Sequence, residues 1–109
     1  MLQGIYLVTF QSSLATVGEG IVVFDACGVH GANETHVFRG LQAGAGRLTV
    51  EILHLGGEKY PSFGALDSIN LDLEVTERTP EGFRALGGIR ESKNIRLHVV
   101  GRRLAALAE

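Results

Sequence analysis

The sequence predicts an all-β protein, in which residues 1–109 form a single domain folded as one eight-stranded antiparallel up-and-down β-barrel. Three observations lead to this fold. Several segments alternate apolar and polar residues with period two, as strands with one solvated face do. The connections between these segments are mostly too short for parallel crossovers. The 15 glycines stand mostly between apolar runs, where they indicate turns.

The first two expected strands, Gly4–Phe10 and Gly20–Ala26, are apolar on both faces. A small single domain has one interior, so the second apolar face of these strands needs another cover. A partner subunit is the simplest cover, and we expect a homodimer. The predicted dimer or partner face consists of Tyr6, Val8, Val22 and Phe24.

The glycine-rich stretch GEGIVVFDACGVHG, Gly18–Gly31, fits either a phosphate-binding loop or hairpin turns. A phosphate-binding loop needs a helix after it, whereas a run typical of a strand follows Gly20. We therefore predict turns around Gly28 and Gly31, with the positive φ angles that glycine tolerates. Two short strands are expected next, at Gly28–His30 and Thr35–Leu41.

Three later segments alternate most clearly: Arg47–Leu55, Ser68–Glu77 and Asn94–Leu104. Phe83–Ile89 completes the eight strands, and its glycine pair allows a bend. The apolar residues predicted to line the barrel lumen are Ile52, Ile69, Leu71, Leu73, Leu97 and Val99. A barrel of this size is either filled by its own side chains or holds one small ligand, and the sequence leaves both open.

One connection, Gly56–Asp67, is long. Within it Lys59–Phe63 is expected to form a helical turn that plugs an open end of the barrel. The last residues, LAALAE, are too few for more than a frayed turn or a strand end.

Composition limits the partners and the compartment. The net charge of −2 and the isoelectric point near 6.1 give no general attraction to nucleic acid or to an anionic membrane, although Arg102 and Arg103 form a small basic spot. The single cysteine, Cys27, excludes an internal disulfide and suits a reducing compartment. The segment MLQGIYLVTF does not resemble a signal peptide, so we expect a soluble cytoplasmic protein.

No arrangement of residues indicates catalysis, a metal or a cofactor. The four histidines, His30, His36, His54 and His98, lack the short spacings that place two imidazoles on one metal, although two could meet across a barrel. The serines lack the glycine setting of a nucleophile elbow. An enzyme that uses His54 or His98 at the barrel mouth is kept only as an alternative.

The chain resembles the GrlR family of small bacterial proteins from Gly4 to about Leu104. The resemblance is carried by GIYLVTF, GEGIVVF, HVFRG, SFGALD, INLDLEV and NIRLHVVGRRL. It implies a lipocalin-like or calycin-like barrel, a homodimer and no catalysis. The founding member of the family is a negative regulator of a type III secretion locus, and it inhibits a transcriptional activator by binding it directly.

One loop departs from that family. Its founding member engages the activator through an exposed Glu-Asp-Glu-Asp loop, whereas the corresponding connection here, Leu41–Arg47, contains no acidic residue. The family's partner-binding residues therefore do not transfer to this chain. We expect a non-enzymatic barrel that acts by binding another protein, such as a regulator. The alternative is a carrier or sensor of a small apolar ligand inside the barrel.

Overall fold

The computed structural model describes residues 2–13, 16–55 and 68–108. Within them the chain forms eight strands: β1 (Gly4–Ser12), β2 (Thr16–Phe24), β3 (Gly28–Ala32), β4 (His36–Ala43), β5 (Arg47–His54), β6 (Ser68–Thr79), β7 (Gly82–Ile89) and β8 (Ser92–Ala105). One turn of 3-10 helix, η1 (Gly44–Gly46), joins β4 to β5. The helical turn predicted at Lys59–Phe63 lies outside the described residues.

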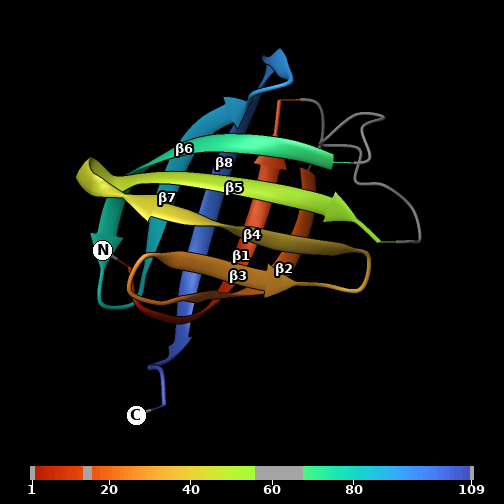
Figure 1. Ribbon diagram of the computed structural model, residues 1–109. Coiled ribbons are helices and arrows are strands. Elements are labelled where there is room, and N and C mark those ends of the chain that lie inside the picture. Colours follow the sequence, from red (N-terminus) through yellow and green to blue (C-terminus); the bar gives the residue numbers. More distant parts are fainter. Residues whose placement is uncertain (1, 14–15, 56–67, 109) are drawn as a thin grey trace.

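The strands close into one antiparallel barrel (Figure 1). Each strand pairs with the next along the chain, and β8 returns to pair with β1. Val8 of β1, for example, lies between Gly20 of β2 and Gly101 of β8. The predicted all-β class and the eight-stranded up-and-down barrel are confirmed.

The strand order places the connections alternately at the two ends of the barrel. The turns after β2, β4 and β6 lie at one end, which we call the terminal end because β1 begins and β8 ends there. Strands β1, β3, β5 and β7 finish at the opposite end.

Aromatic rings fill much of the interior. The rings of Tyr6, Phe24 and Phe83 meet edge to face, with centroids 5.2 to 5.5 Å apart. Phe10 and Phe38 form a second pair at 5.4 Å. Each such pair contributes roughly 0.5–1.5 kcal/mol beyond the area that it buries. The rings therefore join strands that are far apart around the barrel wall.

The predicted outer face of the first two strands is wrong. Tyr6, Val8, Val22 and Phe24 point into the barrel and are only 2 to 4% exposed. Because β1 and β2 are apolar on both faces, alternation alone does not identify the inner face. The rings of Tyr6 and Phe24 determine which face lies inside, because they bury the largest apolar area and pack against Phe83 of β7.

Glycines inside strands accommodate these rings. A Cβ on Gly20 would collide with the ring of Phe38, and one on Gly101 would collide with the ring of Phe83. The positive φ angles predicted at Gly28 and Gly31 are not found, because both glycines lie in β3. Several glycines that the sequence suggested were turn residues thus lie within strands, where they allow close packing.

Candidate functional site

The barrel interior is a packed core where the structure describes it. All six residues predicted to line the lumen are buried, namely Ile52, Ile69, Leu71, Leu73, Leu97 and Val99. Three of them, Leu71, Leu73 and Val99, line a cavity together with aromatic rings of the core, and its volume is about 30 Å³. Ligand pockets usually measure roughly 300–1,000 Å³, so this space is smaller by about a factor of ten.

A continuous apolar surface lies outside β1 and β2. We call it the outer β1–β2 face and define it by Ile5, Leu7, Ile21 and Val23. Ile5 pairs with Val23 and Leu7 with Ile21, so the four side chains are neighbours on the outside of the barrel. Ile21 is 43% exposed and the other three are half-buried.

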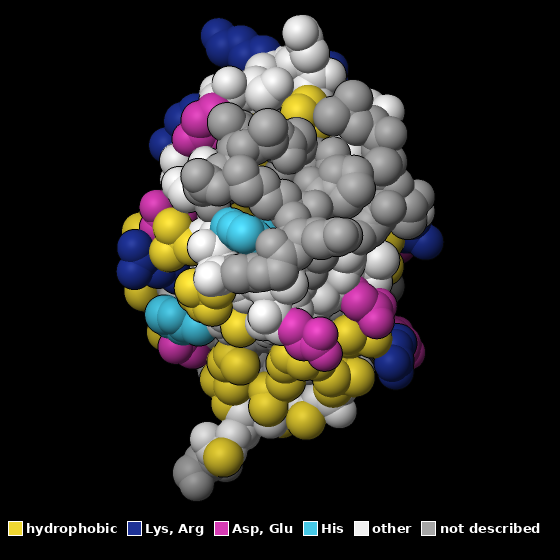
Figure 2. All heavy atoms as spheres, turned by 90° about the vertical axis from the view of Figure 1, so that its right-hand side faces the viewer, with side chains coloured by type: hydrophobic (Ala, Val, Ile, Leu, Met, Phe, Trp, Pro, Cys, Tyr) yellow, Lys and Arg dark blue, Asp and Glu magenta, His cyan; other side chains and the backbone are white. Residues whose placement is uncertain are grey.

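Polar residues and one further leucine border this face. Arg102 of β8 lies opposite Leu7, and His30 of β3 lies opposite Val23. His30 forms a 3.8 Å ion pair with Asp25 when it is protonated. Leu104 of β8 is 45% exposed, beside the irregularity in the β1–β8 pairing. Figure 2 shows hydrophobic side chains gathered on the lower part of one side of the molecule.

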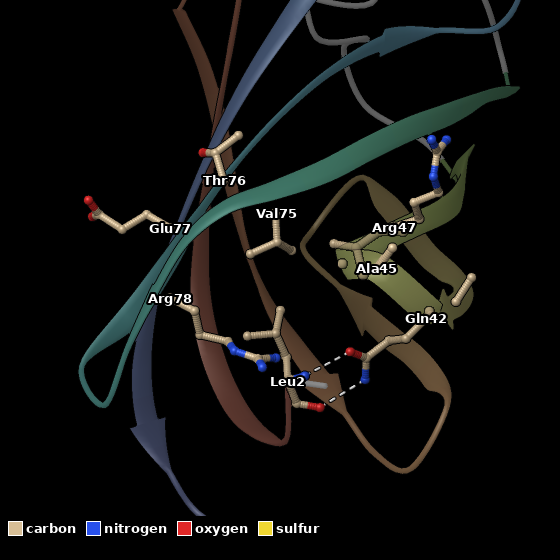
Figure 3. A pocket seen from close by; sticks show the side chains of 12 residues that line it. Leu2, Gln42, Ala45, Arg47, Val75, Thr76, Glu77 and Arg78 are labelled. Atoms are coloured by element: carbon tan, nitrogen blue, oxygen red, sulfur yellow. Dashed lines mark hydrogen bonds between the residues drawn. The ribbon is translucent and has the colours of Figure 1, made fainter.

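A groove of about 510 Å³ opens at the terminal end (Figure 3). One wall is the η1 turn with the adjoining residues of β4 and β5, and the other is the last part of β6. Leu2, Leu48 and Val75 supply its apolar surface. Arg47 and Arg78 also line it, and Figure 3 shows the guanidinium of Arg78 pointing toward Leu2 whereas that of Arg47 points away.

Gln42 fixes one wall of this groove. Its Oε1 accepts a hydrogen bond from Leu2 N at 2.9 Å, and its Nε2 donates to Leu2 O at 2.8 Å and to Asp25 O at 3.0 Å. The Gln42 side chain lies in β4 and is nearly fully buried. It ties the N-terminal segment and the β2–β3 turn to β4, so this side of the groove is held rigidly. Its role was not anticipated from the sequence, where Gln42 stood in an expected loop.

Two of the four histidines meet at the opposite end. His36 and His54 pair across β4 and β5, with ring centroids 5.0 Å apart. His36 Nδ1 also lies 2.7 Å from the hydroxyl oxygen of Thr35. Burial and the neighbouring His54 lower the pKa of His36. The structure therefore favours the neutral imidazole at position 36.

These histidines do not assemble a larger cluster with the other candidates. His30 points outward from β3, and His98 points outward from β8, where it pairs with Gln11 and Leu86. Among the described residues, no three His, Cys, Asp or Glu side chains stand close enough to hold a metal ion. Cys27 is exposed in the β2–β3 turn.

Two surface acids, one on β6 and one in the β7–β8 turn, make structural contacts. Asp72 accepts hydrogen bonds from Arg90 Nη2 at 2.7 Å and from its Nε at 3.1 Å, which lowers the pKa of the carboxyl. Glu91 accepts from the backbone and side-chain nitrogens of Asn70, and these bonds lower its pKa as well. Both contacts tie the β7–β8 turn to β6.

A comparison of the sequence with family models and with curated proteins finds no match. The part of the chain that the structure describes contains no helix long and apolar enough to cross a membrane. The resemblance to the GrlR family stays a prediction.

Proposed function

We propose that this protein is a non-enzymatic barrel that acts by binding other proteins, and that a second copy of the chain is its first partner. The observation that carries the proposal is the outer β1–β2 face. Ile5, Leu7, Ile21 and Val23 are adjacent and partly exposed on a barrel whose interior is already filled. Removing apolar surface from water contributes about 25 cal/mol per Å², from which the cost of association is subtracted.

The shape of this face supports a symmetric dimer. A two-fold interface uses the same patch on both subunits, so the apolar patch of one copy faces the apolar patch of the other. Two antiparallel strands present such a patch, with Arg102 and His30 at its border. A dimer of this kind leaves the terminal end accessible for a further protein. The chain would act as a negative regulator by covering part of that protein's surface.

The alternative of a small apolar ligand inside the barrel gains no support from the described residues. Its predicted lining forms the core around the 30 Å³ cavity. A ligand there would have to displace side chains such as Leu71 and Val99, which are 0% and 2% exposed.

The test is Ile21→Lys, measured by sedimentation velocity over a range of protein concentrations. A charge on the outer β1–β2 face would be desolvated in the interface, so we expect this variant to be monomeric where the unmodified chain is dimeric. Leu86→Lys is the matched control, because Leu86 is 50% exposed but pairs with Glu74 and His98 on other strands. An unmodified chain that is monomeric throughout, or a dimer that survives Ile21→Lys, contradicts the proposal.

A further inference from the structure

The last part of β6 is a sheet edge. β6 pairs with β5 from Ser68 to Glu74, where Glu74 meets Arg47 at the start of β5. β6 itself continues to Thr79, and over this last part it pairs with β7. On the side away from β7, no described strand pairs with Val75–Thr79. We call these five residues the β6 edge.

A bulge turns this edge away from the β5 hairpin. The pairing register of β6 with β7 shifts between Val75 and Glu77. Bulges bend a strand and increase its local twist. In Figure 1 β6 crosses the barrel beside β5, passes the β4–β5 turn and then curves down toward its end. The bulge therefore opens the wall of the barrel beside the edge.

The groove of about 510 Å³ lies along the opening, lined on one side by Val75–Arg78. Figure 3 shows Val75 and Arg78 pointing from β6 toward Leu2 and Gln42, whereas Glu77 points to the other side. The facing wall is held by the hydrogen bonds of Gln42. An extended chain laid along the edge would meet backbone groups of β6 on one side and this fixed wall on the other.

The charges of the groove indicate what kind of chain fits. Arg39, Arg84 and Arg90 each form an ion pair, with Glu51, Glu77 and Asp72 respectively. Arg47 and Arg78 form none with any residue that the structure describes. Glu77, the acidic residue of the lining, is engaged by Arg84 at 3.5 Å. Arg78, whose guanidinium points toward Leu2, is therefore the cation that a carboxylate in the groove would meet.

We infer that the β6 edge binds an extended acidic segment of a partner protein by strand addition, with Arg78 pairing with one of its carboxylates. This inference rests on the proposed function in treating the chain as a protein-binding module, but it uses a different surface. Main-chain hydrogen bonds supply affinity in strand addition, and alternate side chains supply specificity. Here an apolar side chain would pack beside Val75 and Leu2, and an acidic one would reach Arg78.

The probe is a fluorescein-labelled peptide of alternating glutamate and valine, six residues long and blocked at its C-terminus. We expect saturable binding by fluorescence anisotropy, and a matching peptide with lysine in place of glutamate should not bind. Arg78→Glu is expected to weaken binding about tenfold or more, because it replaces a charge-assisted contact by a repulsion. Arg96→Glu is the control, since Arg96 is an exposed cation on β8 outside the groove.

Two further measurements separate strand addition from charge attraction. The same peptide with alternate backbone nitrogens methylated keeps its charge but loses half of its main-chain donors, and we expect it not to bind. In amide hydrogen exchange, the peptide should protect residues within Val75–Thr79. Equal binding of the methylated peptide, or protection confined to other strands, overturns the inference. So does binding that Arg78→Glu leaves unchanged.

The inference and the proposed function can fail separately. The Ile21→Lys variant is expected to bind the peptide as the unmodified chain does, because Ile21 lies outside the groove. Loss of the dimer with peptide binding retained supports both. A dimer that survives Ile21→Lys contradicts the outer face alone, and absence of peptide binding contradicts the β6 edge alone.

Discussion

At the scale of single residues, Gln42 does more for this structure than its position in the sequence suggests. One buried amide satisfies both backbone groups of Leu2 and the carbonyl of Asp25. Backbone groups that lose a partner while buried cost roughly 1–3 kcal/mol each. The residue therefore holds the terminal end together at the point where the groove begins.

Replacing Gln42 by leucine tests this role. Gln42→Leu keeps a similar volume but leaves the Leu2 and Asp25 groups without these partners, so we expect the free energy of unfolding to fall by about 2 kcal/mol. Urea denaturation followed by circular dichroism measures it. Gln11→Leu is the control, because Gln11 is exposed, and its effect should stay within about 0.5 kcal/mol. Equal effects of the two substitutions would show that the hydrogen bonds contribute little.

At the scale of elements, the strands differ in how far their sequences determine their orientation. In β6 the buried Ile69, Leu71 and Leu73 alternate with more exposed polar residues, so the inner face followed directly from the pattern. In β1 and β2 both faces are apolar, and the inner one depends on rings contributed by other strands. Alternation cannot report on such contacts, and the predicted face was inverted for that reason.

The contact between His36 and His54 could have been predicted from the sequence if the register of the β4–β5 hairpin had been known. A β4–β5 hairpin centred on Ala45 pairs Ala43 with Arg47 and, continuing outward, His36 with His54. The sequence located both strands, but it ended the first at Leu41 although β4 runs to Ala43, and it did not locate the tip of the turn, where Ala45 has a φ of 63°. Glycines flank it on both sides, so the pattern left the register open.

The packing of a ring over a glycine gives a prediction at this scale. In Gly101→Ala the new Cβ of β8 collides with the Phe83 ring, which must shift within the aromatic cluster. We expect a loss of about 1–3 kcal/mol in the free energy of unfolding. Gly44→Ala is the control, because nothing lies within 4 Å of a Cβ there. Thermal unfolding of both variants checks this, and a Gly101→Ala variant as stable as Gly44→Ala would contradict the packing described.

At the scale of the whole molecule, the stability depends on pH in one direction. The pKa values of His36, Asp72 and Glu91 are all lowered in the folded protein. A group with a lowered pKa binds its proton more readily when the chain is unfolded, so acid favours unfolding. His36 lowers the free energy of unfolding as the pH falls below 6.5, the ordinary pKa of histidine. Asp72 and Glu91 lower it only below 3.8 and 4.5, the ordinary pKa values of these carboxyls.

The contribution of His36 can be isolated. Between pH 7.5 and pH 5.5 we expect the free energy of unfolding to decrease, and His36→Gln should flatten this dependence because glutamine does not titrate. His30→Gln is the control, since His30 is exposed on β3. Urea denaturation at several pH values gives the slopes. An unchanged slope in His36→Gln would show that the folded and unfolded states protonate this histidine alike.

The pairing of β1 with β8 joins the first and last strands, with partners such as Gln11 and His98 far apart in the chain. During synthesis β1 leaves the ribosome long before β8 exists, so one of its edges has no barrel partner for most of translation. Loop closure over such a distance is slow, because its entropic cost precedes the contacts that offset it. The apolar residues of β1 are therefore exposed to aggregation while the chain is being made, and a chaperone that shields them would act at this strand.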